Sequence, residues 1–281
     1  MSTTSPIHAA LVLGSDSFRL LVGTVEDGTL RPLDSYHAPL RLADHALAAV
    51  RVVATSTLRM ARNSHLFLPA AQQLLGHPVQ VLSGEEEASL TYLGVTDSTG
   101  SAGAAARTLV LGIGGGSTQL ALGSERRVQK VASLGLGTSR LALTFFGGGR
   151  IDAVSFAAAI ASTRAKLGDE TPAFGPSRRD RVYGCSGTIH TLARLLVDNG
   201  LAGPITRDRL ETLAVRALAQ GGGGTPLAGL GHLRLRDVAA ALAILLGLME
   251  ELEIDELEVP QTGLRAGVLA ELRLGRAALA A

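Results

Sequence analysis

Two short segments of this 281-residue chain repeat one pattern: an apolar stretch, a tip of Gly and Ser residues, and a second apolar stretch. The segments are residues 11–18 and 111–120. Each predicts a β-hairpin whose small tip leaves backbone N–H groups exposed, and a concave set of such donors fits phosphate oxygens. An ordinary turn explains one copy alone, because Gly and Ser are common in turns for steric reasons. Two copies favour a duplicated fold whose tips share one ligand that carries several phosphates.

Strands and helices alternate along both halves of the chain, which predicts an α/β fold in each half. We expect strands at residues 10–13, 18–25, 50–55, 79–82, 108–113, 118–122, 128–134, 181–183 and 257–259. We expect helices at residues 56–76, 83–93, 154–167, 189–196, 207–218, 237–251 and 264–272. A Gly-, Ser- and Ala-rich stretch at residues 97–106 predicts a surface loop near a domain boundary. The expected domains are therefore residues 1–105 and 106–281, each with one hairpin.

Composition excludes several classes of function. The chain is 46% hydrophobic and 18% charged, with a formal net charge of +1, so a local site must hold any anion. Aromatic residues make up only 3% and Trp is absent, which argues against nucleic acid as a partner. The longest apolar run, residues 238–249, is shorter than the ~20 residues of a membrane span and predicts a buried helix. The first eight residues do not resemble a signal peptide, and the single Cys185 suits a reducing compartment, so we expect a cytoplasmic protein.

A third Gly-rich turn lies between an expected strand and the apolar helix at residues 189–196. It contains Ser186, Gly187 and Thr188. A helix that begins after such a turn presents free N–H groups and the positive end of its dipole to an anion. A plain capped turn is the alternative interpretation.

The chain resembles the Ppx/GppA family of exopolyphosphatases and guanosine pentaphosphate phosphohydrolases in an ordered set of segments. They are LGSDSF (13–18), ATSTLR (54–59), SGEEEA (83–88), YLGV (92–95), IGGGST (113–118), SLGLG (133–137) and GLRAG (263–267). The resemblance implies a two-domain actin-like, sugar-kinase-like (RNase H-like) fold. It implies activity on inorganic polyphosphate or guanosine pentaphosphate, and a possible homodimer.

The resemblance also implies roles for individual residues. Glu87 would be the general base that activates the attacking water, and Arg59 would contact the transferred phosphate. The alternatives are structural: Ser83 and Glu86 have the spacing of a capping box, and Arg59 could be a solvated helix residue. The expected phosphate-binding residues are those of the three Gly-rich turns: Gly14, Ser15, Asp16, Ser17, Gly114, Gly115, Gly116, Ser117, Thr118, Ser186, Gly187 and Thr188.

The chain departs from the family where carboxylates are expected to hold Mg²⁺. Val12 stands where the family usually carries Asp or Asn, Gly112 stands where it usually carries Asp, and Gln119 stands where it usually carries Glu. Mg²⁺ prefers oxygen ligands in octahedral order, so these changes remove expected ligands. Asp16, where the family commonly has Asn, is the candidate substitute ligand. The segment before residue 53 is also shorter than the family's.

Three functions are therefore compared. The first is a phosphohydrolase that acts on phosphoanhydride ends. The second is a catalytically weakened protein that binds polyphosphate or guanosine polyphosphates, which the missing carboxylates favour. The third is a sugar or acid kinase of the same fold, but no motif for a base over a sugar hydroxyl is evident.

Overall fold

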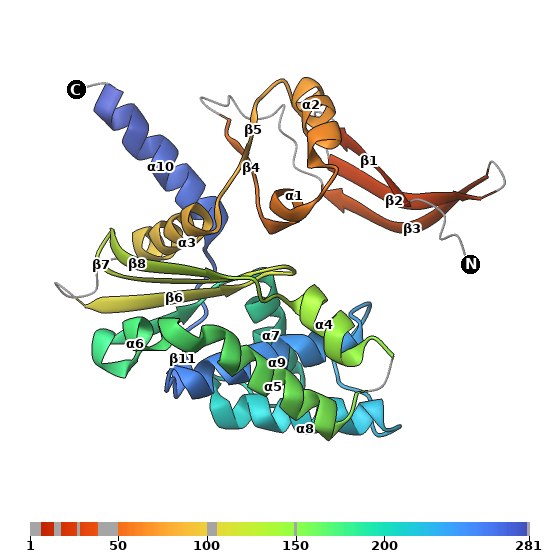
Figure 1. Ribbon diagram of the computed structural model, residues 1–281, viewed down its shortest axis with the longest axis vertical. Helices are drawn as coiled ribbons and strands as arrows, with labels where there is room; N and C mark the ends of the chain where they lie inside the picture. The colour runs from red at the N-terminus through yellow and green to blue at the C-terminus, as the bar shows by residue number, and fades with distance from the viewer. Residues whose placement is uncertain are drawn as a thin grey trace. The chain divides into compact units, whose positions relative to one another are not determined.

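The computed structural model describes residues 7–13, 18–26, 29–38, 50–99, 106–148 and 151–279 (Figure 1). Strands and helices alternate along these residues, as the sequence predicts. The chain divides into two compact units, residues 1–52 with 63–79, and residues 53–62 with 80–281. Each unit is described by itself below, and the domain boundary expected between residues 105 and 106 stays a prediction.

The first unit contains a three-stranded antiparallel sheet in the order β1-β2-β3. Its strands are β1 (Ile7–Leu13), β2 (Phe18–Glu26) and β3 (Thr29–Ala38). Leu13 pairs with Phe18, so β1 and β2 form the first expected hairpin, and the register of β2 against β3 shifts between Val22 and Gly23. The sequence predicts the hairpin, but β3 is not among the expected strands.

The expected single helix at residues 56–76 is wrong, because the structure has two helices there. These are α1 (Ser56–Met60) in the second unit and α2 (Ser64–Leu75) in the first. Ala61 takes an extended conformation (φ −68°, ψ 121°), which ends α1, and Asn63 then precedes α2. The apolar spacing that suggested one helix does not mark a buried face, since no residue of α2 is buried.

The second unit is built on a four-stranded sheet in the order β8-β7-β6-β9. Strands β6 (Arg107–Ile113), β7 (Thr118–Ser124) and β8 (Arg127–Leu134) are antiparallel, and β9 (Arg181–Gly184) runs parallel to β6. Six consecutive residues of β6 and of β7 are buried, so both faces of the sheet are covered. Two short pairs complete the strands: β4 (Val52–Ala54) with β5 (Val79–Val81), and β10 (Ile205–Thr206) with β11 (Glu256–Leu257).

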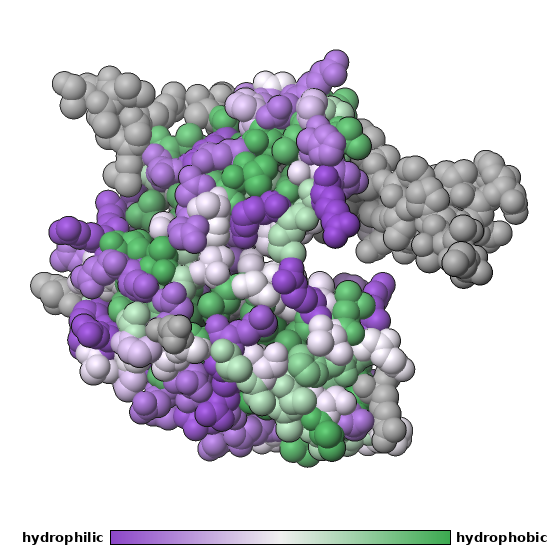
Figure 2. Space-filling model, in the orientation of Figure 1, coloured by the Kyte–Doolittle hydropathy of each residue, from purple (hydrophilic) through white to green (hydrophobic). Residues whose placement is uncertain are grey.

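Helices cover both faces of this sheet (Figure 1). On one face lie α3 (Gly84–Thr99) and α10 (Leu264–Leu279). On the other lie α4 (Thr138–Phe146), α5 (Ala153–Leu167), α6 (Thr171–Phe174), α7 (Gly187–Asp198), α8 (Arg207–Gly221) and α9 (Leu235–Glu251). Polar and apolar residues are interspersed over the visible surface of this second group of helices (Figure 2).

The apolar run at residues 238–249 forms the centre of the core, because all of its residues are buried within α9. The burial of α9 confirms the prediction of a core helix. Among the residues that the structure describes, no helix has both the length and the apolar character that a membrane crossing requires.

Helix α3 is longer than predicted and packs closely against α10. It continues to Thr99, and the hydroxyls of Thr96, Ser98 and Thr99 donate to carbonyl oxygens one turn earlier. A Cβ atom at Gly94 would lie 2.1 Å from the carbonyl oxygen of Gly263, and one at Gly267 would lie 1.7 Å from that of Leu90. Glycines therefore permit the crossing, which explains why the YLGV and GLRAG segments need small residues.

Candidate active site

The second Gly/Ser tip, residues 114–117, is held by the helix that follows the sheet. The N–H of Gly114 donates to the carbonyl oxygen of Ser117 over 2.8 Å, and Thr138 and Ser139 at the start of α4 donate to Gly114 and Gly115 over 3.0 Å each. A Cβ atom at Gly137 would lie 2.5 Å from the backbone of Gly115. The tip and the start of α4 therefore pack backbone to backbone, and Gly137 makes that contact possible.

Arg59 on α1 and Glu87 on α3 form an ion pair beside this tip. The two guanidinium nitrogens Nη1 and Nη2 of Arg59 lie 3.2 Å and 3.1 Å from Glu87 Oε2. Nη1 also donates to the carbonyl oxygen of Leu82 over 2.6 Å, which fixes the guanidinium. The side chains are 24% and 14% exposed, so the alternative in which Arg59 is an ordinary solvated residue does not hold.

Ser117 joins this pair to the tip. Arg59 Nη2 lies 3.5 Å from Ser117 Oγ, and the side-chain amide of Gln119 donates to the same hydroxyl oxygen over 2.7 Å. The structure therefore brings together the two expected catalytic residues and one expected phosphate-binding residue. Arg59 and Ser117 are 58 residues apart in the chain, and β4, α1 and the β6–β7 hairpin position them.

Burial raises the pKa of Glu87 above its ordinary value, and the hydrogen bond and charge of Arg59 oppose that rise. The neighbouring Glu86 has a different task. Its carboxylate accepts from the N–H of Ser83 over 2.7 Å, and its own N–H donates to Ser83 Oγ over 3.1 Å. The capping box predicted from the sequence is thus confirmed, and Glu87 takes no part in it.

A cavity of about 650 Å³ within the second unit is lined by Glu87 and by the adjoining ends of strands β6 and β7. Its remaining lining residues come from α3, β6, β7, the start of α7 and the start of α10: Thr91, Gly112, Ile113, Gly114, Gln119, Cys185, Ser186, Gly187, His190, Gln261, Thr262, Gly263, Leu264, Arg265, Ala266 and Leu269. The open space beside Glu87 can therefore accept a ligand of the size of a nucleotide.

The third Gly-rich turn reaches this cavity, but the hydroxyl of Ser186 has structural partners. Ser186 Oγ accepts from the N–H of Ile189 over 3.2 Å and from that of Ile113 over 3.3 Å, so it caps α7. Gly187 lines the cavity, whereas Thr188 is not among its lining residues. Thr118 is fully buried and donates to the carbonyl oxygen of Leu136 over 2.8 Å, so its side chain points away from the cavity.

His190 and Arg265 are among the lining residues that were not predicted to be functional from the sequence. His190 Nδ1 lies 2.7 Å from the carbonyl oxygen of Ser186, and its Nε2 lies 2.9 Å from that of Pro260. This ring therefore joins the first turn of α7 to the segment before α10, where exposed Arg265 also lines the cavity. Their positions depend on the folding of distant segments, which no spacing in the sequence indicates.

The Gly/Ser residues of the first tip, Gly14, Ser15, Asp16 and Ser17, lie outside the described residues. Their expected role, and that of Asp16 as a metal ligand, stay predictions. Cys185 lies in the wall of the cavity, where burial raises the pKa of its thiol to about 12. It is therefore a protonated wall residue at neutral pH.

The described residues do not fit a Mg²⁺ site. Gly112 and Gln119 face each other across the antiparallel pair β6–β7 and both line the cavity. Glu87 is the one carboxylate among the lining residues, and its Oε2 is already paired with Arg59. Within the described part of the chain, no three His, Cys, Asp or Glu residues cluster closely enough to hold a metal ion. The Mg²⁺ expected from the resemblance therefore has no described set of ligands.

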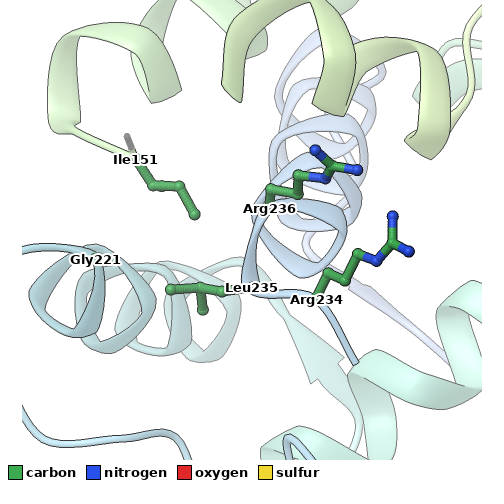
Figure 3. A pocket seen from close by; sticks show the side chains of 5 residues that line it. All are labelled: Ile151, Gly221, Arg234, Leu235 and Arg236. Atoms are coloured by element: carbon green, nitrogen blue, oxygen red, sulfur yellow. The ribbon is translucent and has the colours of Figure 1, made fainter. Parts of the chain in front are cut away.

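A second cavity of about 430 Å³ lies on the helical side of the second unit, near the start of α9 (Figure 3). It is lined by Ile151, Gly221, Arg234, Leu235 and Arg236. None of these is a residue that the sequence predicts to be functional. We therefore assign the candidate active site to the cavity beside Glu87.

Comparisons with known proteins find similarity along most of the chain. A model of the Ppx/GppA phosphatase family matches residues 31–275. The guanosine-5'-triphosphate,3'-diphosphate pyrophosphatase of Vibrio vulnificus (strain YJ016) is 32% identical over 95% of this chain and 59% of its own length. The protein of the same name from Aeromonas salmonicida (strain A449) is 32% identical over 94% of this chain and 59% of its own length. The chain thus spans about three fifths of these curated relatives.

Solved structures agree on the fold. The Aquifex aeolicus PPX-GPPA enzyme is similar with a TM-score of 0.67 and 24% identity, covering 95% of this chain and 100% of that one. An exopolyphosphatase from Cytophaga hutchinsonii gives a TM-score of 0.71 and 19% identity, covering 96% and 98%. The expected fold class, the two-domain actin-like α/β fold, is confirmed.

Proposed function

Because the chain belongs to the Ppx/GppA phosphatase family, we propose that it is a phosphohydrolase that removes the terminal phosphate from a phosphoanhydride chain. The observation that carries the proposal is the group formed by Arg59, Glu87 and Ser117 beside an open cavity. A carboxylate, a cation and a hydroxyl within contact of one another are the groups that water attack on a phosphate requires.

In the proposed reaction Glu87 takes a proton from a water molecule, and the water oxygen attacks the terminal phosphorus. The bond from phosphorus to the bridging oxygen breaks, and the departing phosphate chain keeps the electron pair. As Glu87 becomes protonated, its attraction for Arg59 falls, so the guanidinium is free to balance the negative charge that develops on the transferred phosphoryl group.

Guanosine pentaphosphate is the substrate that we place first. The support is the printed name of the curated relatives, which are guanosine-5'-triphosphate,3'-diphosphate pyrophosphatases. Inorganic polyphosphate is the alternative substrate, and the name of one similar solved structure, an exopolyphosphatase, supports it. Both substrates end in a phosphoanhydride, so the same three residues would serve either.

The test is phosphate release from guanosine pentaphosphate and from long-chain polyphosphate by the full chain and by Glu87→Gln. We expect the variant to bind substrate but to lose at least ~100-fold in rate, which is the usual contribution of a general base. Glu85→Gln is the matched control, because Glu85 is exposed on the same turn of α3 and does not line the cavity. Equal rates for Glu87→Gln and the wild type would overturn the proposal.

A catalytically weakened binding protein is the second candidate. The observation that favours it is the uncharged pair Gly112 and Gln119, which stand where carboxylates are expected. Tight binding of guanosine pentaphosphate without any phosphate release by the wild type would establish this second function and exclude the first.

A further inference from the structure

We infer that the phosphate end is bound beside Glu87 without a divalent cation, and that Gln119, which lines the cavity, is a positioning residue that orients the Ser117 hydroxyl next to it. The inference rests on the proposed function, because it concerns how the same cavity binds its anion. It assigns to Gln119 a task beyond the loss of a metal ligand.

The first support is the place of the two residues. Gly112 and Gln119 are paired across β6 and β7, and both border the cavity that Glu87 lines. A Cβ atom at Gly112 would lie 3.1 Å from the carbonyl oxygen of Cys185 and 3.9 Å from Gln119 Oε1. The side-chain amide of Gln119 therefore lies over Gly112, and a carboxylate at either position would point into the same space.

The second support is the balance of charge around the cavity. Among its described lining residues Glu87 is the one acid, and Arg59 neutralises it at 3.1 Å. Arg265 lines the same space, and no described residue forms an ion pair with its exposed side chain. A phosphate that enters therefore meets no unpaired carboxylate among these residues, and a bridging cation is not needed to offset repulsion.

The third support is the direction of the hydrogen bonds on Ser117. Its hydroxyl oxygen accepts from Gln119 Nε2 over 2.7 Å, and Arg59 Nη2 lies 3.5 Å from it. Ser117 is itself buried and does not line the cavity, but Gln119, which holds its hydroxyl, does. A hydroxyl has one donor and two acceptor positions, so these two donors leave its own proton for an acceptor such as a phosphate oxygen. A glutamate carboxylate at position 119 could only accept a hydrogen bond. It would accept the Ser117 hydroxyl proton in place of a phosphate oxygen, and it would add a negative charge beside the phosphate.

The experiment separates ion binding from catalysis. Binding of Mn²⁺, as a paramagnetic substitute for Mg²⁺, is followed by electron paramagnetic resonance on the full chain without any anion. Binding of imidodiphosphate, whose P–N–P bridge resists hydrolysis, is measured by calorimetry in EDTA and in Mg²⁺. We expect the wild type to bind no Mn²⁺ at this cavity and to bind imidodiphosphate equally in both buffers, within about twofold.

The variants reverse these properties. Gln119→Glu is expected to weaken imidodiphosphate binding in EDTA by about 10-fold or more, because it replaces a donor by a charged acceptor. The double variant Gly112→Asp/Gln119→Glu is expected to gain one Mn²⁺ site and to require Mg²⁺ for tight anion binding. Gly148→Asp/Gln129→Glu makes the same change of charge at two exposed positions, and it should behave as the wild type.

The outcomes distinguish the inference from the proposed function. Anion binding by the wild type that needs Mg²⁺, above all if Asp16→Ala abolishes that need, would overturn the cation-free site and leave the phosphohydrolase proposal standing. Unchanged binding by Gln119→Glu in EDTA would also overturn it. No binding of imidodiphosphate in either buffer would overturn both. Gln119→Glu alone keeps the experiment decisive if the tight space at Gly112 prevents the double variant from folding.

Discussion

The two hairpins of the molecule share a backbone plan, and the second is joined to further elements of its unit. In both, a seven-residue strand is followed by a four-residue connection, since Leu13 pairs with Phe18 and Ile113 with Thr118. The register of the second strand then shifts between Val22 and Gly23 in one sheet and between Leu122 and Gly123 in the other. The repeat therefore extends to the bulge, one hundred positions later in the chain.

The second hairpin contacts three other elements of its unit. Strand β6 pairs with the parallel strand β9, the tip accepts hydrogen bonds from the start of α4, and Ser117 contacts Arg59 of α1. The charged side chains beside the second hairpin come from α1 and α3. The repeated backbone plan therefore does not by itself supply those charged groups, which lie outside the motif.

The largest effect is expected where the second tip meets α4. Gly137→Val would place side-chain atoms against the backbone of Gly115 and Gly116, which lies within 2.5 Å of even a Cβ. We expect a loss of about 3 kcal/mol in the free energy of unfolding, measured by urea denaturation, because the obstacle is backbone and not a flexible side chain. Gly148→Val is the control, since nothing lies within 4 Å of its Cβ position. Equal stability of the two variants would show that this contact does not hold the tip.

A smaller effect compares the serines of the two tips. Ser117→Ala removes the hydroxyl that lies between Arg59 and Gln119, and we expect about a 10-fold rise in KM for guanosine pentaphosphate. The sequence expectation that Ser15 contacts the same anion predicts a similar rise for Ser15→Ala. Kinetics of the two single variants and of the double variant measure this. A KM that changes for Ser117→Ala alone would limit anion binding to the second hairpin.

The smallest effect concerns pH. Arg59 lowers the pKa of Glu87 against the rise that burial causes. Replacement by an apolar residue, Arg59→Leu, should therefore raise that pKa further. The general base must be ionised, so the acid side of the pH–rate profile of kcat/KM should move to higher pH in this variant. If the acid limb of the profile stays at the same pH in Arg59→Leu, that limb reports the titration of a group other than Glu87. Arg62→Leu, a nearby arginine outside the cavity, is the control.

The sign of this titration also concerns stability. The folded protein binds the Glu87 proton more tightly than the unfolded chain does, because the pKa of Glu87 is raised above its ordinary value of 4.5. The contribution of Glu87 to folding is therefore most favourable below pH 4.5, and it falls as pH rises through the raised pKa. The Glu87 carboxylate thus costs stability at neutral pH, as is common for groups that active sites keep buried.

The sequence predicts most of the fold because the patterns of apolar residues and of Gly/Ser turns are clear along most of the chain. The fully apolar run at residues 238–249 indicates a core helix, and the Gly/Ser tip at residues 114–117 sits between two strands as expected. The break at Ala61 was missed, because apolar spacing continues across it while the backbone turns extended. Helix α4 (Thr138–Phe146) was missed as well, although Leu141, Ala142 and Phe146 form its buried face.

The candidate site was predicted in part. Glu87, Arg59 and Ser117 were named from the sequence, and the structure brings them together. Thr118 was named as a phosphate ligand, but alternation along β7 turns its side chain into the core. His190 and Arg265 were missed as cavity residues, because they reach it from α7 and α10, whose packing no local pattern encodes.

The central claim is that Arg59 and Glu87 act as one unit in phosphate release. A double-mutant cycle tests it most directly, with kcat/KM for guanosine pentaphosphate measured for the wild type, Arg59→Leu, Glu87→Gln and the double variant. The account predicts that each single change costs at least ~100-fold and that the double variant is little worse than the poorer single one. Losses that multiply, or a Glu87→Gln enzyme with the rate of the wild type, would contradict it.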